Sequence, residues 1–402
     1  MSAPRPFAPV GGGVAAPRGF SAGGAACGLK PSGAPDLALV VSDRPASAAG
    51  VYTTNVVKAA PVLLCQARTA AGYARAVVAN SGNANACTGE AGDDAAARMA
   101  AVAAAHPAID ARPHDVLVLS TGIIGVPLPV EKIEHTLPGL TLLSSAEGGD
   151  RAARAIMTTD TRPKTAAVSF TVDDVDVRIG GMAKGSGMIH PQMATMLSVL
   201  TTDAAIAPDA LQRFLARAVD ESFNMIDVDG DSSTNDTVLL LANGAAGVTP
   251  PDDVFAAALA AVCTSLARQV ARDGEGATKL VQVRVSGAAD RAEAVLAARA
   301  VVSSNLVKSA LYGADPNWGR IMCAAGYSGA RFDAARAHLS LQGVALFAGG
   351  MPLPFDAVAA SNALRASEVS IDLDLGAGDG AATAWGCDLT PEYVHINADY
   401  TT

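Results

Sequence analysis

Several features that would point to other protein classes are scarce or absent in this sequence. No block of five lysines or arginines occurs and the net charge is −10, which disfavours nucleic-acid and anionic-membrane partners. No run of about 18 uncharged apolar residues is present, so we expect no membrane span. Residues 1–20 lack the charged and then apolar segments of a secretory signal. These absences favour a cytoplasmic protein.

Residue patterns for metal, nucleotide or serine chemistry are also missing. The six cysteines lie far apart with no CxxC pair, so reduced thiols are expected rather than disulfides or a zinc site. The six histidines never pair at i, i+4, and no HExxH occurs. Lys184 is followed by Gly-Ser but does not have the order of a Walker loop, and there is no GxSxG elbow. We therefore predict no metal and no cofactor.

What is present is a long, apolar chain in which strand and helix patterns alternate. Half of the 402 residues are hydrophobic, enough for a large core and for two or three domains. Interleaved strands and helices predict an α/β architecture. The strands are expected at 37–42, 75–79, 116–120, 166–172, 238–241, 280–285, 369–375 and 384–388. The helices are expected at 91–105, 152–157, 210–223, 254–272, 292–302 and 355–366. Within 254–272, one apolar face is expected to carry Phe255, Leu259, Val262, Leu266 and Val270.

Loops rich in glycine and small polar residues join these elements. Such loops at strand ends let backbone donors approach a ligand closely, although each of them alone is also compatible with an ordinary turn. They span residues 80–89, 120–122, 180–187, 227–236 and 313–320.

A threonine nucleophile remains open as a mechanism, because it needs no histidine. An N-terminal threonine uses its own α-amino group as the base for its hydroxyl. The chain begins with Met1, so internal cleavage would have to create such a terminus. Thr195, within Met193-Ala194-Thr195-Met196-Leu197, could serve or could be a buried strand residue, and the pattern alone leaves both open.

The segment from Lys184 to Leu197, KGSGMIHPQMATML, resembles the self-cleavage segment of the ornithine acetyltransferase (glutamate N-acetyltransferase) family. The resemblance continues in the same order over nearly the whole chain. It includes residues 53–61, 80–89, 120–122, 157–161, 229–236, 273–279, 315–320 and 393–402. Gln192 and Pro391 depart from the family pattern, and neither removes a reacting group.

The resemblance implies an architecture and an assembly. The expected fold is α/β, with two stacked sheets between helical layers and a smaller C-terminal α/β domain. Cleavage between Ala194 and Thr195 would give an alpha chain, 1–194, and a beta chain, 195–402, that stay in one fold. The cleavage point is not expected to be a domain boundary, because strand-like residues flank it. The two chains are expected to form a heterotetramer of two alpha and two beta chains.

The resemblance also implies an activity. The Thr195 hydroxyl would take the acetyl group from N-acetylornithine and pass it to glutamate, and some family members also use acetyl-CoA. Thr121 and Gly122 would form the oxyanion hole. Substrate contacts would fall on Thr158, Lys184, Thr195, Glu275, Asn397 and Thr402. The charge of Lys184 suits an α-carboxylate, and that of Glu275 suits an amino group.

Two other functions remain compatible with the sequence. An amidohydrolase or aminopeptidase with the same N-terminal threonine would let water resolve the acyl-enzyme. An uncleaved, non-catalytic protein of this fold could bind metabolites instead.

Overall fold

The computed structural model describes residues 7–190 and 196–399. Gln192, Ala194, Thr195 and Thr402, which carry part of the sequence-based predictions, lie outside the described residues.

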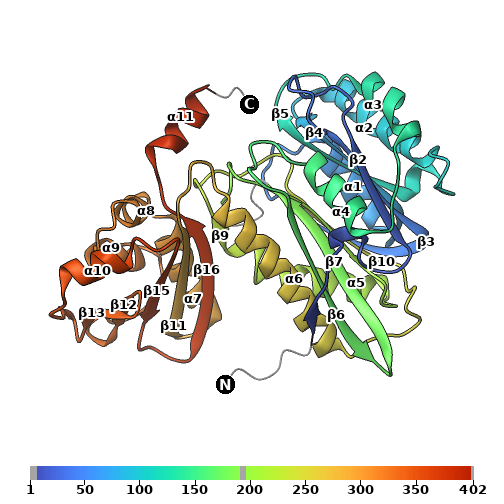
Figure 1. Ribbon diagram of the computed structural model, residues 1–402. Helices are drawn as coiled ribbons and strands as arrows, with labels where there is room; N and C mark the ends of the chain where they lie inside the picture. Colours follow the sequence, from blue (N-terminus) through green and yellow to red (C-terminus); the bar gives the residue numbers. More distant parts are fainter. Residues whose placement is uncertain (1–6, 191–195, 400–402) are drawn as a thin grey trace.

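Nine strands of the described chain form the first sheet, which occupies the larger lobe (Figure 1). Its order is β1-β6-β7-β8-β10-β3-β4-β5, and β2 pairs with β3 outside this path. The strands are β1 (Ala8–Pro9), β2 (Phe20–Ala25), β3 (Leu37–Tyr52), β4 (Tyr73–Asn83), β5 (Val116–Ile123), β6 (Lys164–Val172), β7 (Val175–Lys184), β8 (Leu197–Thr202) and β10 (Thr237–Ala242). The long β3 joins the two halves of this sheet, since residues 37–42 pair with β2 and residues 47–52 with β10.

Helices cover the faces of this sheet. They are α1 (Ala60–Thr69), α2 (Gly89–Ala104), α3 (Val130–Thr136), α4 (Ala146–Ala155), α5 (Pro208–Asp220) and α6 (Asp252–Arg272). Helix α4 packs against β2 and β3, while α1 and α2 pack against β5. Single 3₁₀ turns occur at 13–15, 113–115, 137–139, 223–225 and 334–336.

The second sheet has seven strands among the described residues and forms the smaller lobe (Figure 1). Its order is β14-β13-β12-β15-β11-β16-β9. The strands are β9 (Ile226–Asp227), β11 (Leu280–Ala288), β12 (His338–Leu341), β13 (Val344–Ala348), β14 (Met351–Pro352), β15 (Glu368–Asp374) and β16 (Gly380–Cys387). The remaining helices are α7 (Arg291–Ser303), α8 (Asn305–Tyr312), α9 (Trp318–Gly326), α10 (Ala357–Ala363) and α11 (Pro391–Asp399). Helix α7 packs on β11 and β16.

Helix α6 joins the two lobes. It contacts β6 and β7 of the first sheet and β9, β11 and β16 of the second (Figure 1). Its predicted apolar face, Phe255, Leu259, Val262, Leu266 and Val270, is fully buried in the largest hydrophobic core. By length and composition, helix α6 could cross a bilayer. Helices α7 and α8, which meet at a bend of 54°, reach that length only when they are counted as one span. The packing between the two sheets accounts for the apolar character of α6.

The predicted α/β class, with two sheets, helical layers and a smaller C-terminal α/β unit, is confirmed. Three segments expected as loops lie partly or wholly in strands: residues 80–83 belong to β4, 120–122 to β5 and 180–184 to β7. The third of these departs most from the sequence pattern. Glycine stands in this strand because its faces are crowded. A Cβ on Gly180 would lie 1.9 Å from the carbonyl oxygen of Gly13, and a Cβ on Gly181 would lie 2.5 Å from Cδ2 of Leu200.

Strands β7 and β8 lie on either side of the segment that resembles a cleavage site. They pair antiparallel, and Lys184 is the register partner of Leu197. The chain before and after this segment therefore belongs to one sheet.

Candidate active site

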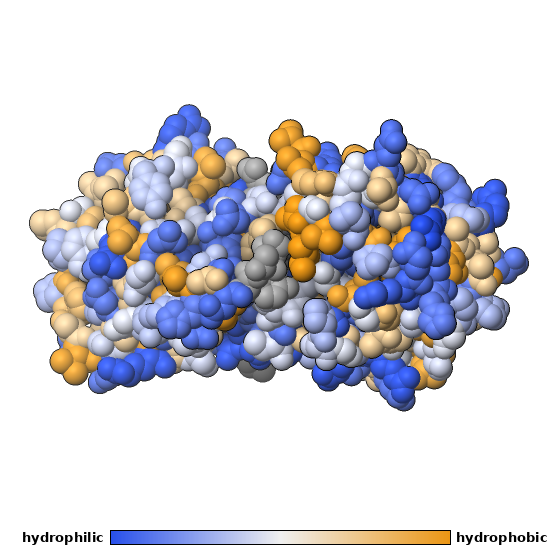
Figure 2. Space-filling model, turned by 90° about the horizontal axis from the view of Figure 1, so that it is seen from above, coloured by the Kyte–Doolittle hydropathy of each residue, from blue (hydrophilic) through white to orange (hydrophobic). Residues whose placement is uncertain are grey.

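A pocket opens where the ends of β5 and β7 meet the loops that follow β9 and α6. The cavity is small, with a volume of about 90 Å³. Seen from above, this face of the molecule is largely hydrophilic, with hydrophobic residues gathered near its middle (Figure 2). The lining residues are Ala84, Thr121, Gly122, Ile124, Thr158, Thr159, Lys184, Gly187, Met188, Ser233, Asn235, Glu275 and Asn397.

Strand β5 carries Thr121 and Gly122 into the pocket. Thr121 is buried, with 4% of its surface exposed. Gly122 has a φ of +134°, and a Cβ there would lie 2.3 Å from the carbonyl carbon of Gly82. Only glycine fits this backbone, because both the left-handed conformation and the neighbouring strand exclude a side chain. The close contact with β4 fixes the peptide that joins Thr121 and Gly122.

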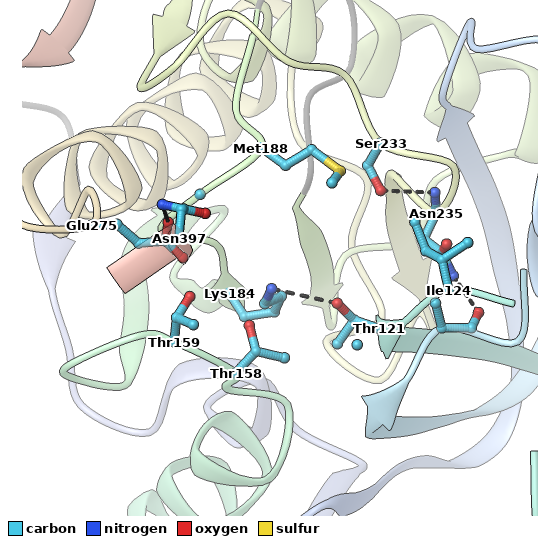
Figure 3. Close-up of a pocket in the computed structure, with 13 residues that line it drawn as sticks. Thr121, Ile124, Thr158, Thr159, Lys184, Met188, Ser233, Asn235, Glu275 and Asn397 are labelled. Atoms are coloured by element: carbon cyan, nitrogen blue, oxygen red, sulfur yellow. Dashed lines mark hydrogen bonds between the residues drawn. The ribbon is translucent and has the colours of Figure 1, made fainter. Parts of the chain in front are cut away.

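Asn235 holds the same strand end from the other side. Its Nδ2 donates to the backbone carbonyls of Ala84, at 2.6 Å, and Ser120, at 2.8 Å. Its backbone N–H in turn donates to the hydroxyl of Ser233 (Figure 3). Because the amide is buried and uses both hydrogens, it ties β4 and β5 to the loop before β10.

Lys184, the last residue of β7, lies in the middle of the pocket (Figure 3). Only 3% of its surface is exposed, and its Nζ donates to Oγ1 of Thr121 at 3.4 Å. Burial lowers the pKa of Lys184, while the negative charges of Asp160, Asp236 and Glu275 act against that shift. None of these carboxylates, within the described residues, forms an ion pair with Lys184, so its ammonium can bind an anion from solution.

Glu275 and Asn397 form the wall on the far side of Lys184 from Thr121 (Figure 3). Nδ2 of Asn397 donates to Oε2 of Glu275 at 2.8 Å, which connects helix α11 to the loop after α6. The backbone N–H of Glu275 donates to the carbonyl of Ser186 at 2.8 Å, so this loop is also tied to the end of β7. Pro391, noted as a departure from the family pattern, is the first residue of α11, where proline is well tolerated.

Thr158 reaches the pocket from the loop between α4 and β6. Its backbone N–H donates to Oδ2 of Asp160 at 2.9 Å. Burial works to raise the pKa of Asp160, but the positive charges of Lys184 and Lys164 outweigh it and hold that pKa at about 2. Asp160 is therefore a carboxylate throughout the physiological range.

Asp236 lies directly before β10, beneath the pocket. Its Oδ1 accepts the backbone N–H of Met196 at 3.0 Å, whereas its buried Oδ2 has no partner among the described residues. Burial raises the pKa of Asp236 well above its ordinary value.

The structure brings together all the predicted site residues that it describes. Thr121, Gly122, Thr158, Lys184, Glu275 and Asn397 line one pocket, while Thr195 and Thr402 lie outside the described residues. A cation, a carboxylate and hydroxyl donors so arranged can bind both ends of an amino acid and stabilise an oxyanion. Sequence reasoning did not single out Thr159, Met188, Ser233 or Asn235, although the segments 157–161, 184–197 and 227–236 contained them. No group of three or more His, Cys, Asp or Glu in the described chain is arranged to hold a metal ion.

Comparison with known proteins identifies the family. A model of the ArgJ family matches residues 21–402. The chain is 55% identical over 401 residues to the arginine biosynthesis bifunctional protein ArgJ of Symbiobacterium thermophilum, covering 98% of this chain and 99% of that protein. The ArgJ protein of Thermus thermophilus is 53% identical over 390 residues, with 97% and 100% covered. A solved ornithine acetyltransferase of Mycobacterium tuberculosis, complexed with ornithine, is 44% identical, with 46% of this chain and 98% of that chain covered and a TM-score of 0.43. With a family match over most of its length and relatives at this identity, the chain belongs to the ArgJ family.

Proposed function

We propose that this chain moves the acetyl group of N-acetylornithine to glutamate through an acetyl ester on the hydroxyl of Thr195. As a member of the ArgJ family, the chain is an acetyltransferase of arginine biosynthesis. The pocket is the observation that supports the detailed reaction. The ammonium of Lys184, the carboxylate of Glu275 and the Thr121–Gly122 backbone face one cavity there. N-acetylornithine and glutamate both present an α-carboxylate that Lys184 can bind.

The nucleophile is made by self-cleavage in this proposal. The Thr195 hydroxyl attacks the carbonyl carbon of Ala194, the peptide nitrogen becomes the free amine of Thr195, and water hydrolyses the ester. Residues 1–194 and 195–402 result and remain in one fold. The pairing of β7 with β8 across this segment supports that retention, because each chain contributes a neighbouring strand to the same sheet.

The register of β7 and β8 supports Thr195 as the nucleophile. Leu197 is the register partner of Lys184, and two residues of chain span at most about 7 Å. This connectivity supports the proposal that Thr195 acts on a substrate that Lys184 binds.

Acetyl transfer then occurs in two steps. The Thr195 hydroxyl, deprotonated by its own α-amine, attacks the acetyl carbonyl of N-acetylornithine, and ornithine leaves as the amine. The α-amine of glutamate attacks the resulting ester, which gives N-acetylglutamate and restores the hydroxyl. Each tetrahedral oxyanion would be stabilised by the hydroxyl of Thr121 and the backbone N–H of Gly122, while Thr158, Glu275, Asn397 and Thr402 complete the substrate contacts.

The assembly and location belong to the same proposal. Two copies of each chain would form a heterotetramer, for which light scattering should give about twice the 40.3 kDa of the full chain. All six cysteines are unpaired, which supports a reducing, cytoplasmic compartment.

The experiment is an assay of the purified protein with glutamate and each donor separately. N-acetylornithine with glutamate should give ornithine and N-acetylglutamate in equal amounts. Acetyl-CoA in place of N-acetylornithine tests the second donor. Release of acetate from N-acetylornithine at the same rate with and without glutamate would instead identify a hydrolase.

A further inference from the structure

Lys164, the first residue of β6, is a fully buried cation held between two carboxylates. Its Nζ lies 2.5 Å from Oδ1 of Asp160 and 2.6 Å from Oδ2 of Asp273. The side chains of the three residues are 0%, 0% and 2% exposed. A lysine is almost never buried this completely unless it is paired. None of these residues lines the pocket, and the proposed reaction assigns none of them a role.

The two carboxylates hold the backbone beside the pocket on two segments, the loop before β6 and the end of β7, and Asp273 itself lies on a third. Asp160 accepts the N–H of Thr158 at 2.9 Å and the N–H of Gly185, directly after Lys184, at 2.7 Å. Asp273 lies two residues before Glu275, and it accepts the N–H of Thr161 at 3.0 Å. Removing Lys164 would take the shared cation away from both carboxylates and leave Asp273 with the partly exposed Arg162, 3.3 Å from its Oδ1, and Asp160 with the positive charge of Lys184.

The same cluster places charge beside Lys184. Asp160 favours the charged ammonium of Lys184, and Lys164 disfavours it. The other charged groups that act on this ammonium are Asp236 and Glu275, which favour it. A further positive charge, on Lys30, is close enough to interact with Lys184. Burial alone lowers the pKa of Lys184, so its charge state depends on the balance among these neighbours.

We propose that Asp160 and Lys164 are positioning residues of the amino-acid site. Asp160 holds the backbone of Thr158 and Gly185, Lys164 holds Asp160, and their opposite charges act on the neighbouring Lys184. The proposal rests on the proposed function, in which Lys184 binds the α-carboxylate of both substrates. Asp160 and Lys164 touch neither substrate in this account, and they act through Lys184 and the backbone beside it.

The test compares the pH dependence of 1/KM for glutamate in the processed wild-type enzyme, in Asp160→Asn and in Lys164→Met. In the wild type, 1/KM should fall at alkaline pH as Lys184 loses its proton. Asp160→Asn removes a favourable negative charge, so the fall should move to lower pH. Lys164→Met removes an unfavourable positive charge, so the fall should move to higher pH. Each shift should be about one pH unit, the size expected for one nearby charge.

The opposite pH shifts expected for Asp160→Asn and Lys164→Met distinguish a positioning role from a purely structural one. Loss of packing would weaken both variants without moving the fall in opposite directions. The matched control is Lys279→Met, which removes another buried lysine, one whose Nζ donates to the carbonyl of Tyr312 at 3.2 Å, away from Lys184. This control should lower the melting temperature and leave unchanged the pH at which 1/KM for glutamate falls. Shifts in the same direction for Asp160→Asn and Lys164→Met, or no shift in either, would overturn the proposal.

If the charge-removing variants yield no processed protein, Asp160→Glu and Lys164→Arg decide the question. These keep the charges but change the hydrogen-bond geometry at Thr158 and Gly185. They should raise KM for both substrates at least several-fold while the fall stays at the wild-type pH, and an unchanged KM would contradict the proposal. Failure of the proposed function would be visible earlier, as a wild-type protein without acetyl transfer.

Discussion

The backbone N–H of Met196 donates to Oδ1 of Asp236 at 3.0 Å, and Met196 is the residue directly after the proposed nucleophile. The carbonyl of Met196 also accepts the N–H of Thr237, at 3.1 Å. Both the backbone N–H and the carbonyl of Met196 are therefore hydrogen-bonded to residues at the start of β10. Met196 directly follows Thr195, whose bond to Ala194 is the one that the proposal requires to break, so these two hydrogen bonds form an anchor beside the proposed cleavage point.

Replacing Asp236 should therefore impair self-cleavage. Asp236→Ala leaves the buried N–H of Met196 without an acceptor, which costs about 1–3 kcal/mol, and frees the start of β8. Asp236→Asn keeps an acceptor oxygen and should retain more processing. The intact masses of freshly purified protein give the cleaved fraction of each variant. Full cleavage of Asp236→Ala at the wild-type rate would show that the anchor has no role in processing.

The raised pKa of Asp236 predicts a pH dependence of stability. A carboxyl group whose folded-state pKa exceeds its unfolded value stabilises the fold below the unfolded pKa, about 3.9, and loses that contribution as pH rises through the folded pKa. The amide of Asp236→Asn does not titrate, so this variant does not lose stability in that way as the pH rises. The melting temperature of Asp236→Asn minus that of its parent should therefore increase from about pH 5 to about pH 8. Both proteins should carry Thr195→Ala, so that no new α-amine titrates, and a difference that is constant with pH would contradict the prediction.

Thr121→Ala should act mainly on kcat. Its hydroxyl stabilises charge that develops only in the transition state, so its loss should lower kcat by about 10²–10³-fold with little change in KM. The cleaved fraction must be measured first, because the same donor would stabilise the oxyanion at Ala194. Thr171→Ala, on an exposed position of β6, is the matched control and should keep wild-type kinetics. An unchanged kcat in cleaved Thr121→Ala would exclude the hydroxyl from the oxyanion hole.

Lys184→Met should act mainly on KM. The ammonium binds a carboxylate present in both the ground state and the transition state, and loss of one partner of a buried charge pair costs about 2–5 kcal/mol. KM should rise for glutamate and for N-acetylornithine together. Lys132→Met removes an exposed lysine from α3 and should leave both values unchanged. If only one substrate were affected, the shared α-carboxylate site would be wrong.

Periodicity and strand composition located much of the fold. The five apolar residues predicted along one face of α6 are all fully buried, and the strand predicted at 116–120 is the start of β5. Strand β7 was not predicted, because Gly180 and Gly181 indicate a loop locally, and only the close approach of Gly13 and Leu200 explains them in a sheet. Helix α9 was also missed, because its start lies within a segment, 313–320, that resembles a loop.

The candidate site was predicted through family resemblance more than through local patterns. Six of the predicted residues line the pocket, yet the residues that hold them could not be found from sequence. Asp160 and Asp273 are 113 positions apart, and only the packing of the end of α6 beside β6 places both against Lys164. Asn235 was missed for the same reason, since Ser120 lies in β5 and Ala84 directly follows β4, both far from Asn235 in the sequence.

The most direct test of the central claim is the intact mass of the purified enzyme after incubation with N-acetylornithine in the absence of glutamate. The account predicts two chains, 1–194 and 195–402, with one acetyl group on the second chain, attached to the hydroxyl of Thr195. Glutamate should remove this group as N-acetylglutamate, and Thr195→Ala should give one uncleaved, unacetylated chain. An active wild-type enzyme that remains a single chain of 402 residues, or that carries the transferable acetyl group elsewhere, would contradict the account.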